Sequence, residues 1–188
     1  MSARIRVSRI AQVPDPTRLE RCLRLPELGP RLLFFSGGTA LRDISATLKE
    51  YTHNSIHLIT PFDSGGSSAK LRDAFDMLAI GDLRNRMMAL ADESAKGNPD
   101  IYRLFSYRLS TEASPTELRA ELVAMVAGTH RLVAKISEPM QRLIRTHLRY
   151  FAERMPDGFD LGVASIGNLI LAGGYLFNEG DIQSVIFL

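Results

Sequence analysis

In the first third of the chain, short apolar segments alternate with segments whose apolar residues recur at the spacing of a helix. Arg31–Phe35 predicts a buried strand, and Ser55–Thr60 predicts a second one. Thr39–Tyr51 lies between them and repeats its apolar residues with a helical period. A strand, a helix and a strand in this order form a βαβ unit, so we expect two parallel strands joined by a right-handed crossover.

Helical periods dominate the remainder of the sequence. Lys70–Leu78 and Leu83–Ala91 predict two helices, and Asn98–Met155 reads as helical almost throughout. Within that stretch, Ser114-Pro115-Thr116-Glu117 combines a capping serine, a proline at the first helical position and a glutamate placed for a capping box. Leu169–Phe177 predicts a further helix, whose two glycines permit close packing against a neighbour.

The two ends of the chain differ in character. Residues 1–30 are interpreted as an N-terminal extension of a domain over residues 31–188. Arg4-Ile5-Arg6-Val7 alternates like a short edge strand, which we favour over a targeting segment, although Met1–Ile10 is arginine-rich and lacks acids. Ile182–Leu188 predicts a strand or the start of a buried helix. An apolar end leads us to expect further protein or a covering partner chain, and favours a homodimer.

Composition narrows the class of protein. The 188 residues are 45% hydrophobic and 23% charged, which is ordinary globular usage and predicts one domain. Twenty-three basic and 21 acidic residues leave a net charge of +2, too balanced for a nucleic-acid-binding stripe. Cys22 is the single cysteine, so no intrachain disulfide forms and we expect a cytoplasmic protein. No apolar run is long enough for a membrane span, so no membrane partner is expected.

The first candidate for chemistry is motif A, Ser36-Gly37-Gly38-Thr39, which follows the first predicted strand. A glycine turn at a helix N-terminus points free N–H groups and the positive end of the helix dipole at one spot, which suits a phosphate. The motif lacks the lysine of a Walker A loop and the three spaced glycines of a dinucleotide fingerprint. A plain turn that needs glycine for its backbone angles is the competing interpretation.

Motif B, Asp63-Ser64-Gly65-Gly66-Ser67-Ser68, follows the second predicted strand. Its glycines allow close backbone approach, its serines offer hydroxyl groups, and Asp63 is suited to a metal ion or a ribose hydroxyl. Lys70 and Arg72 come directly after it. A flexible surface loop is the alternative, but open α/β sheets bind ligands at the carboxyl ends of successive parallel strands.

Motifs C and D are two further polar segments at helix starts. Motif C is Gly81-Asp82-Leu83-Arg84-Asn85, in which Asp82 is suited to cap a helix beginning at Leu83. Arginine is an unusual choice at the positive end of a helix, so Arg84 and Asn85 are interpreted as phosphate ligands. Motif D is Ser165-Ile166-Gly167-Asn168, either an anion site or an ordinary cap by Ser165.

Other reactive side chains form no recognisable pattern. The four histidines, His53, His57, His130 and His147, lack the spacing of a zinc site, and we interpret them as surface or core residues. Cys22 has no neighbours that suggest a nucleophile.

Taken in order, the four motifs resemble the CofD family, which comprises 2-phospho-L-lactate transferase and its relatives, including the gluconeogenesis-factor branch. The resemblance spans about Leu32–Phe177. It implies an α/β fold of Rossmann-like type, with three α/β/α layers around a parallel sheet and a largely helical middle region. The domain over residues 31–188 would then be a nucleotide-binding domain.

The resemblance also implies an activity. The transferase moves a phospholactyl-type group from a guanosine-diphosphate-linked donor to the hydroxyl of a deazaflavin, assisted by Mg2+. The gluconeogenesis-factor branch is associated instead with nucleotide-sugar binding and regulation. The ligand in both cases is a nucleotide-diphosphate type of small molecule.

Site residues follow from the matched motifs. Asp63, Asp82 and Arg84 would be catalytic, and Asp63 and Asp82 would bind Mg2+. The residues expected to hold the substrate or its phosphates are Ser36, Gly37, Gly38, Thr39, Ser64, Gly65, Gly66, Ser67, Ser68, Arg72, Asn85 and Asn168.

The chain departs from the family pattern in three ways. Relatives usually carry another glycine on each side of motif A, and many have two consecutive aspartates where this chain has Asp63-Ser64. Family members also run well beyond 188 residues, so we expect a truncated member whose domain is incomplete at its C-terminal end. Three readings remain open: a transferase, a nucleotide-binding regulator without turnover, and an interaction protein with a vestigial site.

Overall fold

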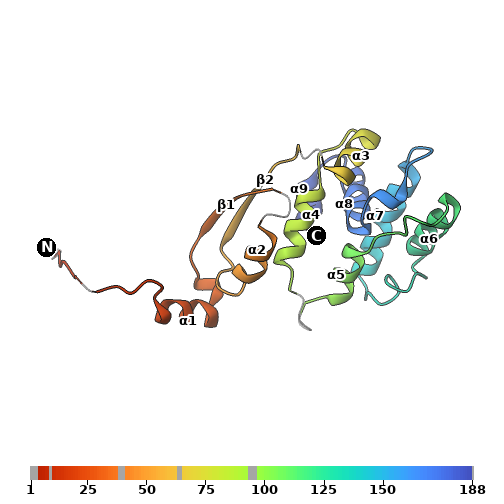
Figure 1. The fold of residues 1–188 in the computed structure, drawn as a ribbon. Helices are drawn as coiled ribbons and strands as arrows, with labels where there is room; N and C mark the ends of the chain where they lie inside the picture. The colour runs from red at the N-terminus through yellow and green to blue at the C-terminus, as the bar shows by residue number, and fades with distance from the viewer. Residues whose placement is uncertain (1–3, 9, 38–40, 63–64, 93–96, 188) are drawn as a thin grey trace.

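The computed structural model describes residues 4–8, 10–37, 41–62, 65–92 and 97–187. One parallel pair of strands and a series of helices make up the described chain (Figure 1). The elements are α1 (Pro16–Arg24), η1 (Pro26–Leu28), β1 (Leu32–Ser36), α2 (Arg42–Leu48), β2 (Ser55–Ile59), α3 (Gly66–Phe75), α4 (Gly81–Leu90), α5 (Pro99–Ser106), α6 (Pro115–Ala127), α7 (Met140–Arg154), η2 (Leu161–Val163), α8 (Ile166–Phe177) and α9 (Ile182–Phe187).

The α/β class and the parallel βαβ unit are confirmed. β1 and β2 pair in parallel with Leu33 opposite Ile56 and Phe35 opposite Leu58. These four side chains share one face of the sheet, and all of them are exposed in the described chain. The other face carries Ser36 and the partly buried residues of both strands, on the side of α2 and α4. The described residues therefore supply the sheet and one layer of helices.

The apolar core lies in the helical part of the molecule. Buried apolar side chains of α3, of α5 to α9 and of the segments between helices form one cluster that extends from Leu71 to Val185. At its centre α8 is buried on nearly all sides, as its continuous apolar sequence dictates. A Cβ added at Gly173 would overlap the backbone oxygen of His147 on α7, so α7 and α8 pack closely, as the glycine pair predicted.

Local sequence signals set several helix boundaries. The capping box predicted at Ser114 is confirmed: its side chain accepts from the Glu117 N–H, and the Glu117 carboxylate accepts from the Ser114 backbone. Ser165 caps α8 in the same way through the Asn168 N–H. Ile182–Phe187 is helical, which decides between the two predicted alternatives.

Two predictions about local structure were wrong. Residues 4–8 form no strand, and Ile5 and Val7 are exposed along an extended segment that leaves the body of the molecule (Figure 1). Alternation gives a segment the right faces but not a neighbouring strand, whose hydrogen bonds an edge strand needs. The helices α3 and α4 begin at Gly66 and Gly81, earlier than Lys70 and Leu83, because Gly66, Ser67 and Ser68 of motif B and Gly81 and Asp82 of motif C lie in the first turns.

No helix in the described ranges combines the length and the apolar character that crossing a membrane requires.

Candidate functional site

Motif C joins the other three motifs. It forms the first turn of α4, which stands between the sheet and the helical core (Figure 1). The Gly81 N–H donates to the Ser68 hydroxyl of motif B over 3.1 Å, and Ser68 is buried. The amino ends of α3 and α4 are therefore tied together, behind the carboxyl ends of β1 and β2.

Motif A reaches motif C at Gly37. A Cβ built on Gly37 would lie 3.8 Å from the Asp82 Oδ2 atom. Asp82 therefore places a carboxylate beside the turn that follows β1. The prediction that Asp82 caps a helix was wrong: Ile80 occupies the cap position without a side-chain bond, and Asp82 lies within the first turn. The Ser68 hydroxyl accepts from the Gly81 N–H, and the Asp82 carboxylate lies beside motif A.

Arg84 connects motif C to motif D. Its Nη1 donates to the Ser165 hydroxyl over 2.5 Å and to the Phe105 carbonyl over 3.2 Å, and its Nη2 donates to the Asn85 Oδ1. A Cβ at Gly167 would lie 2.7 Å from the same Phe105 carbonyl, so α5 and α8 meet where the guanidinium binds. Arg84 and Asn85 are thus engaged with the protein, and their predicted contact with phosphate stays a prediction.

Three arginines give this region a positive field. Burial lowers the pKa of Arg84, and the nearby charges of Arg108 and Arg42 lower it further. Both of these neighbours are exposed. Guanidinium ions that lie close together repel one another. A bound phosphate would reduce this repulsion, so such a group favours anion binding.

Arg86 is a candidate functional residue that was not among the residues predicted from the sequence. It is buried, and its Nη1 donates to the Leu41 carbonyl over 3.0 Å and to the Ser45 hydroxyl. Burial lowers its pKa, and the charge of Asp82 partly opposes that effect. Arg86 therefore ties α4 to the beginning of α2, directly after motif A. The sequence did contain a signal for Arg86. This residue lies three positions after Leu83 and four before Leu90, so it falls on the helix face that the apolar residues define.

The described serines of motifs A and B, namely Ser36, Ser67 and Ser68, are held by protein partners. The Ser36 hydroxyl is buried and lies 2.9 Å from the His57 Nδ1, while the His57 Nε2 lies 3.1 Å from the Ser55 hydroxyl. Burial and the charge of Arg86 lower the pKa of His57. The Ser67 hydroxyl donates to the Val163 carbonyl over 2.5 Å. These described hydroxyls are therefore engaged with the protein.

The remaining predicted residues fall into two groups. Gly65 and Gly66 are exposed at the start of α3, Arg72 lies half-buried on that helix, and Asn168 is buried with an Oδ1 atom that has no hydrogen-bond partner in the described chain. Outside the described residues lie Gly38, Thr39, Asp63 and Ser64.

The position of Asp82 is compatible with a magnesium ion that is shared with a ligand. Within the described ranges, no three histidine, cysteine, aspartate or glutamate side chains gather as a self-sufficient metal site. Mg2+ is commonly held by one or two carboxylates together with substrate phosphates and water. Asp82 provides one such carboxylate beside motif A.

Comparison with known proteins identifies the family of this chain. The family model described as "2-phospho-L-lactate transferase CofD" matches residues 32–187. A Nostoc protein named provisionally as a gluconeogenesis factor is 41% identical over 80 residues, which are 43% of this chain and 17% of that protein. The gluconeogenesis factor of Listeria monocytogenes is 37% identical over 86 residues, which are 46% of this chain and 26% of that protein.

A solved structure is also similar. The crystal structure of a UPF0052-family protein from Bacillus halodurans matches with a TM-score of 0.39 and 29% identity, covering 60% of this chain and 36% of that one. The chain thus matches only about a quarter or less of the length of these curated relatives. Because the family match extends over nearly the whole sequence, the chain belongs to the CofD family.

Proposed function

We propose that this chain binds the diphosphate group of a nucleotide-linked small molecule at the edge site, which we define by Gly37, Arg42, Asp82 and Arg84. The observation that carries the proposal is the junction of the motifs at the first turn of α4. Four segments distant in sequence meet there, at the sheet edge where open α/β folds bind ligands.

Each part of the edge site has a role in this proposal. The glycine backbone after β1 lets a phosphate approach closely, and the exposed guanidinium of Arg42 pairs with its oxygens. Asp82, with Asp63 from motif B, would hold Mg2+ against the diphosphate. The magnesium ion would supply charge neutralisation at the phosphate oxygens. Arg84 adds positive charge from behind, where Ser165 and Phe105 hold it in place.

Binding without turnover, as a regulator, is the function that we favour. The curated relatives that match this chain are named as gluconeogenesis factors. The description of the family model favours a second candidate, transfer of a phospholactyl-type group from a guanosine-diphosphate-linked donor to a deazaflavin hydroxyl. In that case Asp63→Asn should abolish release of the mononucleotide and leave the fold intact. A cytoplasmic location agrees with either candidate.

Thermal shift with GDP and UDP, with and without Mg2+, tests the proposal. A ligand present at 100 times its Kd stabilises the fold by about 2.7 kcal/mol, which raises the melting temperature measurably. We expect a shift that grows when Mg2+ is added. The absence of a shift with either nucleotide would contradict the proposal and favour a vestigial site.

Matched variants locate the binding. Arg42→Ala should weaken GDP binding about tenfold, since a charge-assisted contact is lost, whereas Arg149→Ala on the exposed surface of α7 should leave it unchanged. In the Asp82→Asn variant, the affinity for GDP in the presence of Mg2+ should fall to the affinity measured without Mg2+. Asp157→Asn, at an exposed position, serves as the control for this variant. Equal losses in a variant and its control would show that the nucleotide binds elsewhere.

A further inference from the structure

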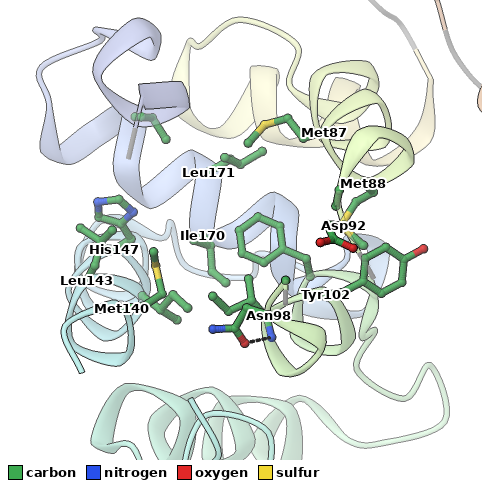
Figure 2. A pocket seen from close by; sticks show the side chains of 16 residues that line it. Met87, Met88, Asp92, Asn98, Tyr102, Met140, Leu143, His147, Ile170 and Leu171 are labelled. Atoms are coloured by element: carbon green, nitrogen blue, oxygen red, sulfur yellow. Dashed lines mark hydrogen bonds between the residues drawn. The ribbon is translucent and has the colours of Figure 1, made fainter. Parts of the chain in front are cut away.

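A second cavity lies in the helical part of the molecule, away from the sheet edge. It has a volume of about 320 Å³, opens to the surface, and is lined by residues of α4, α5, α7, α8 and α9 and of the segments that join α4 to α5 (Figure 2). This volume is at the lower end of the range of small-molecule pockets, about 300–1,000 Å³. No motif identified in the sequence contributes to its walls, so a ligand of the edge site does not account for it.

The walls of the cavity are apolar and adaptable. Ile170 and Leu171 of α8 form one side, and Met87 and Met88 of α4 together with Met140 of α7 form others (Figure 2). Methionine side chains are unbranched and polarizable, so they adjust to ligands of different shape. Asp92, Asn98 and Tyr102 add polar groups to the lining. Over the rest of the wall, a charged or strongly polar ligand would lose its hydration without compensation.

One polar side chain in these walls has an unmet hydrogen bond. His147 of α7 is 3% exposed, and its Nε2 atom has no hydrogen-bond partner in the described chain. Figure 2 shows the imidazole at one side of the cavity, across from Tyr102. Burial lowers the pKa of His147, so the ring is neutral near pH 7.

The imidazole packs against Gly174 of α8 and against the Phe177 ring. A Cβ on Gly174 of α8 would lie 2.9 Å from the His147 Nδ1 and Cε1 atoms, and the Phe177 ring packs 6.0 Å away, centroid to centroid. An unpaired buried nitrogen is costly, and a ligand that carries a single donor or acceptor group would remove the cost.

We propose that this cavity binds a neutral, largely apolar small molecule whose one hydroxyl or amine group pairs with the His147 Nε2. The site is separate from the edge site but adjoins it through α4 and Phe105. The Phe105 carbonyl accepts from Arg84, whereas its side chain lines the cavity. The proposal stands on the cavity and on His147, and it does not depend on nucleotide binding.

Titration with N-phenyl-1-naphthylamine tests the site, because this neutral amine becomes fluorescent in apolar surroundings. We expect saturable binding of one molecule per chain. Leu143→Phe adds volume to the α7 wall at a half-buried position, and should weaken binding at least tenfold. Val123→Phe, on the exposed surface of α6, should bind like the unaltered chain. If Leu143→Phe does not melt cooperatively, Ala91→Leu at the end of α4 replaces it.

Displacement of the fluorescent amine by 1-naphthol and by naphthalene tests the role of His147. Partitioning from water into an apolar phase predicts a certain ratio of the affinities for naphthol and naphthalene. For the unaltered chain this ratio should exceed the partitioning value about two- to tenfold, because one net hydrogen bond contributes about that much. His147→Phe should bind naphthalene equally well and lose this preference.

Three outcomes would overturn the proposal. The first is no saturable binding, and the second is equal binding by Leu143→Phe and Val123→Phe. The third is a dimer of the unaltered chain in sedimentation analysis that Leu143→Phe dissociates, which would make the cavity a contact between copies. Retention of the naphthol preference in His147→Phe would overturn the assignment of the hydrogen bond.

Discussion

The sheet side and the helical side of the molecule are held together by different interactions. In the described chain, every buried apolar side chain lies between Leu71 and Val185, on the helical side. The sheet side buries polar groups instead, namely Ser36, Ser45 and Thr52, which bond to His57, Arg86 and the Pro30 carbonyl. Apolar burial contributes more to stability than buried polar contacts do, so the helical side should be more stable against unfolding than the sheet side. The edge site lies between the two.

The largest expected difference concerns two phenylalanines, one on each side. Phe151 is 0% exposed and packs on Phe75 and Phe159 at centroid distances of 5.2 and 5.7 Å, whereas Phe35 is 83% exposed on β1. Phe151→Ala should lower the free energy of unfolding by about 3–5 kcal/mol, and Phe35→Ala by less than about 0.5 kcal/mol. Urea denaturation measures both, and similar losses would refute the contrast.

A matched pair of glycines tests the contact of α7 with α8. Gly173→Ala would force its Cβ into the His147 carbonyl, and overpacking of this kind costs about 1–3 kcal/mol. Gly66→Ala, at the start of α3, meets no described heavy atom within 4 Å and should be neutral or stabilising by up to about 1 kcal/mol. Thermal unfolding distinguishes them. A neutral Gly173→Ala would mean that the two helices can separate without penalty.

Arg86 tests the junction of the two sides. Arg86→Met keeps most of the side-chain volume but leaves the Leu41 carbonyl and the Ser45 hydroxyl without their donor. We expect a loss of about 1–3 kcal/mol, confined to the sheet side. Hydrogen exchange should accelerate at amides of α2 and β1 and remain unchanged in α7 and α8. Uniform acceleration would show that the two sides unfold as one unit.

The smallest expected effect is a pH dependence from His147. Burial lowers its pKa in the folded state, so the unfolded state binds the proton more tightly. Its contribution is therefore constant above about pH 6.5, the ordinary histidine pKa, and stability falls as the pH drops through that value towards the lower folded pKa. Urea denaturation at several pH values should show a steeper decline for the unaltered chain than for His147→Phe. Parallel curves would contradict the assignment.

The sequence predicts local features of this fold better than it predicts contacts. The capping box at Ser114, the βαβ unit and the glycine contact of α8 each depend on a few neighbouring residues, and all three are confirmed. The exposed face of the sheet was not foreseen, because apolar strand residues predict burial without specifying what covers them.

The same distinction applies to the candidate site. The order of the motifs predicted that Gly37, Asp82 and Ser68 belong to one region, and the structure joins them. The role of Arg86 could not be derived, because its partners Leu41 and Ser45 are more than 40 residues away. The cavity around His147 was equally beyond reach, because its walls come from five helices.

Amide NMR spectra recorded during titration with GDP and Mg2+ test the central claim most directly. The account predicts saturable shifts at Gly37, Asp82 and their neighbours in motifs A to C, with little change around His147. Asp82→Asn should remove the Mg2+-dependent part of these shifts. Shifts concentrated on the walls of the helical cavity, or none at saturating nucleotide, would contradict the claim that the first turn of α4 organises a diphosphate site.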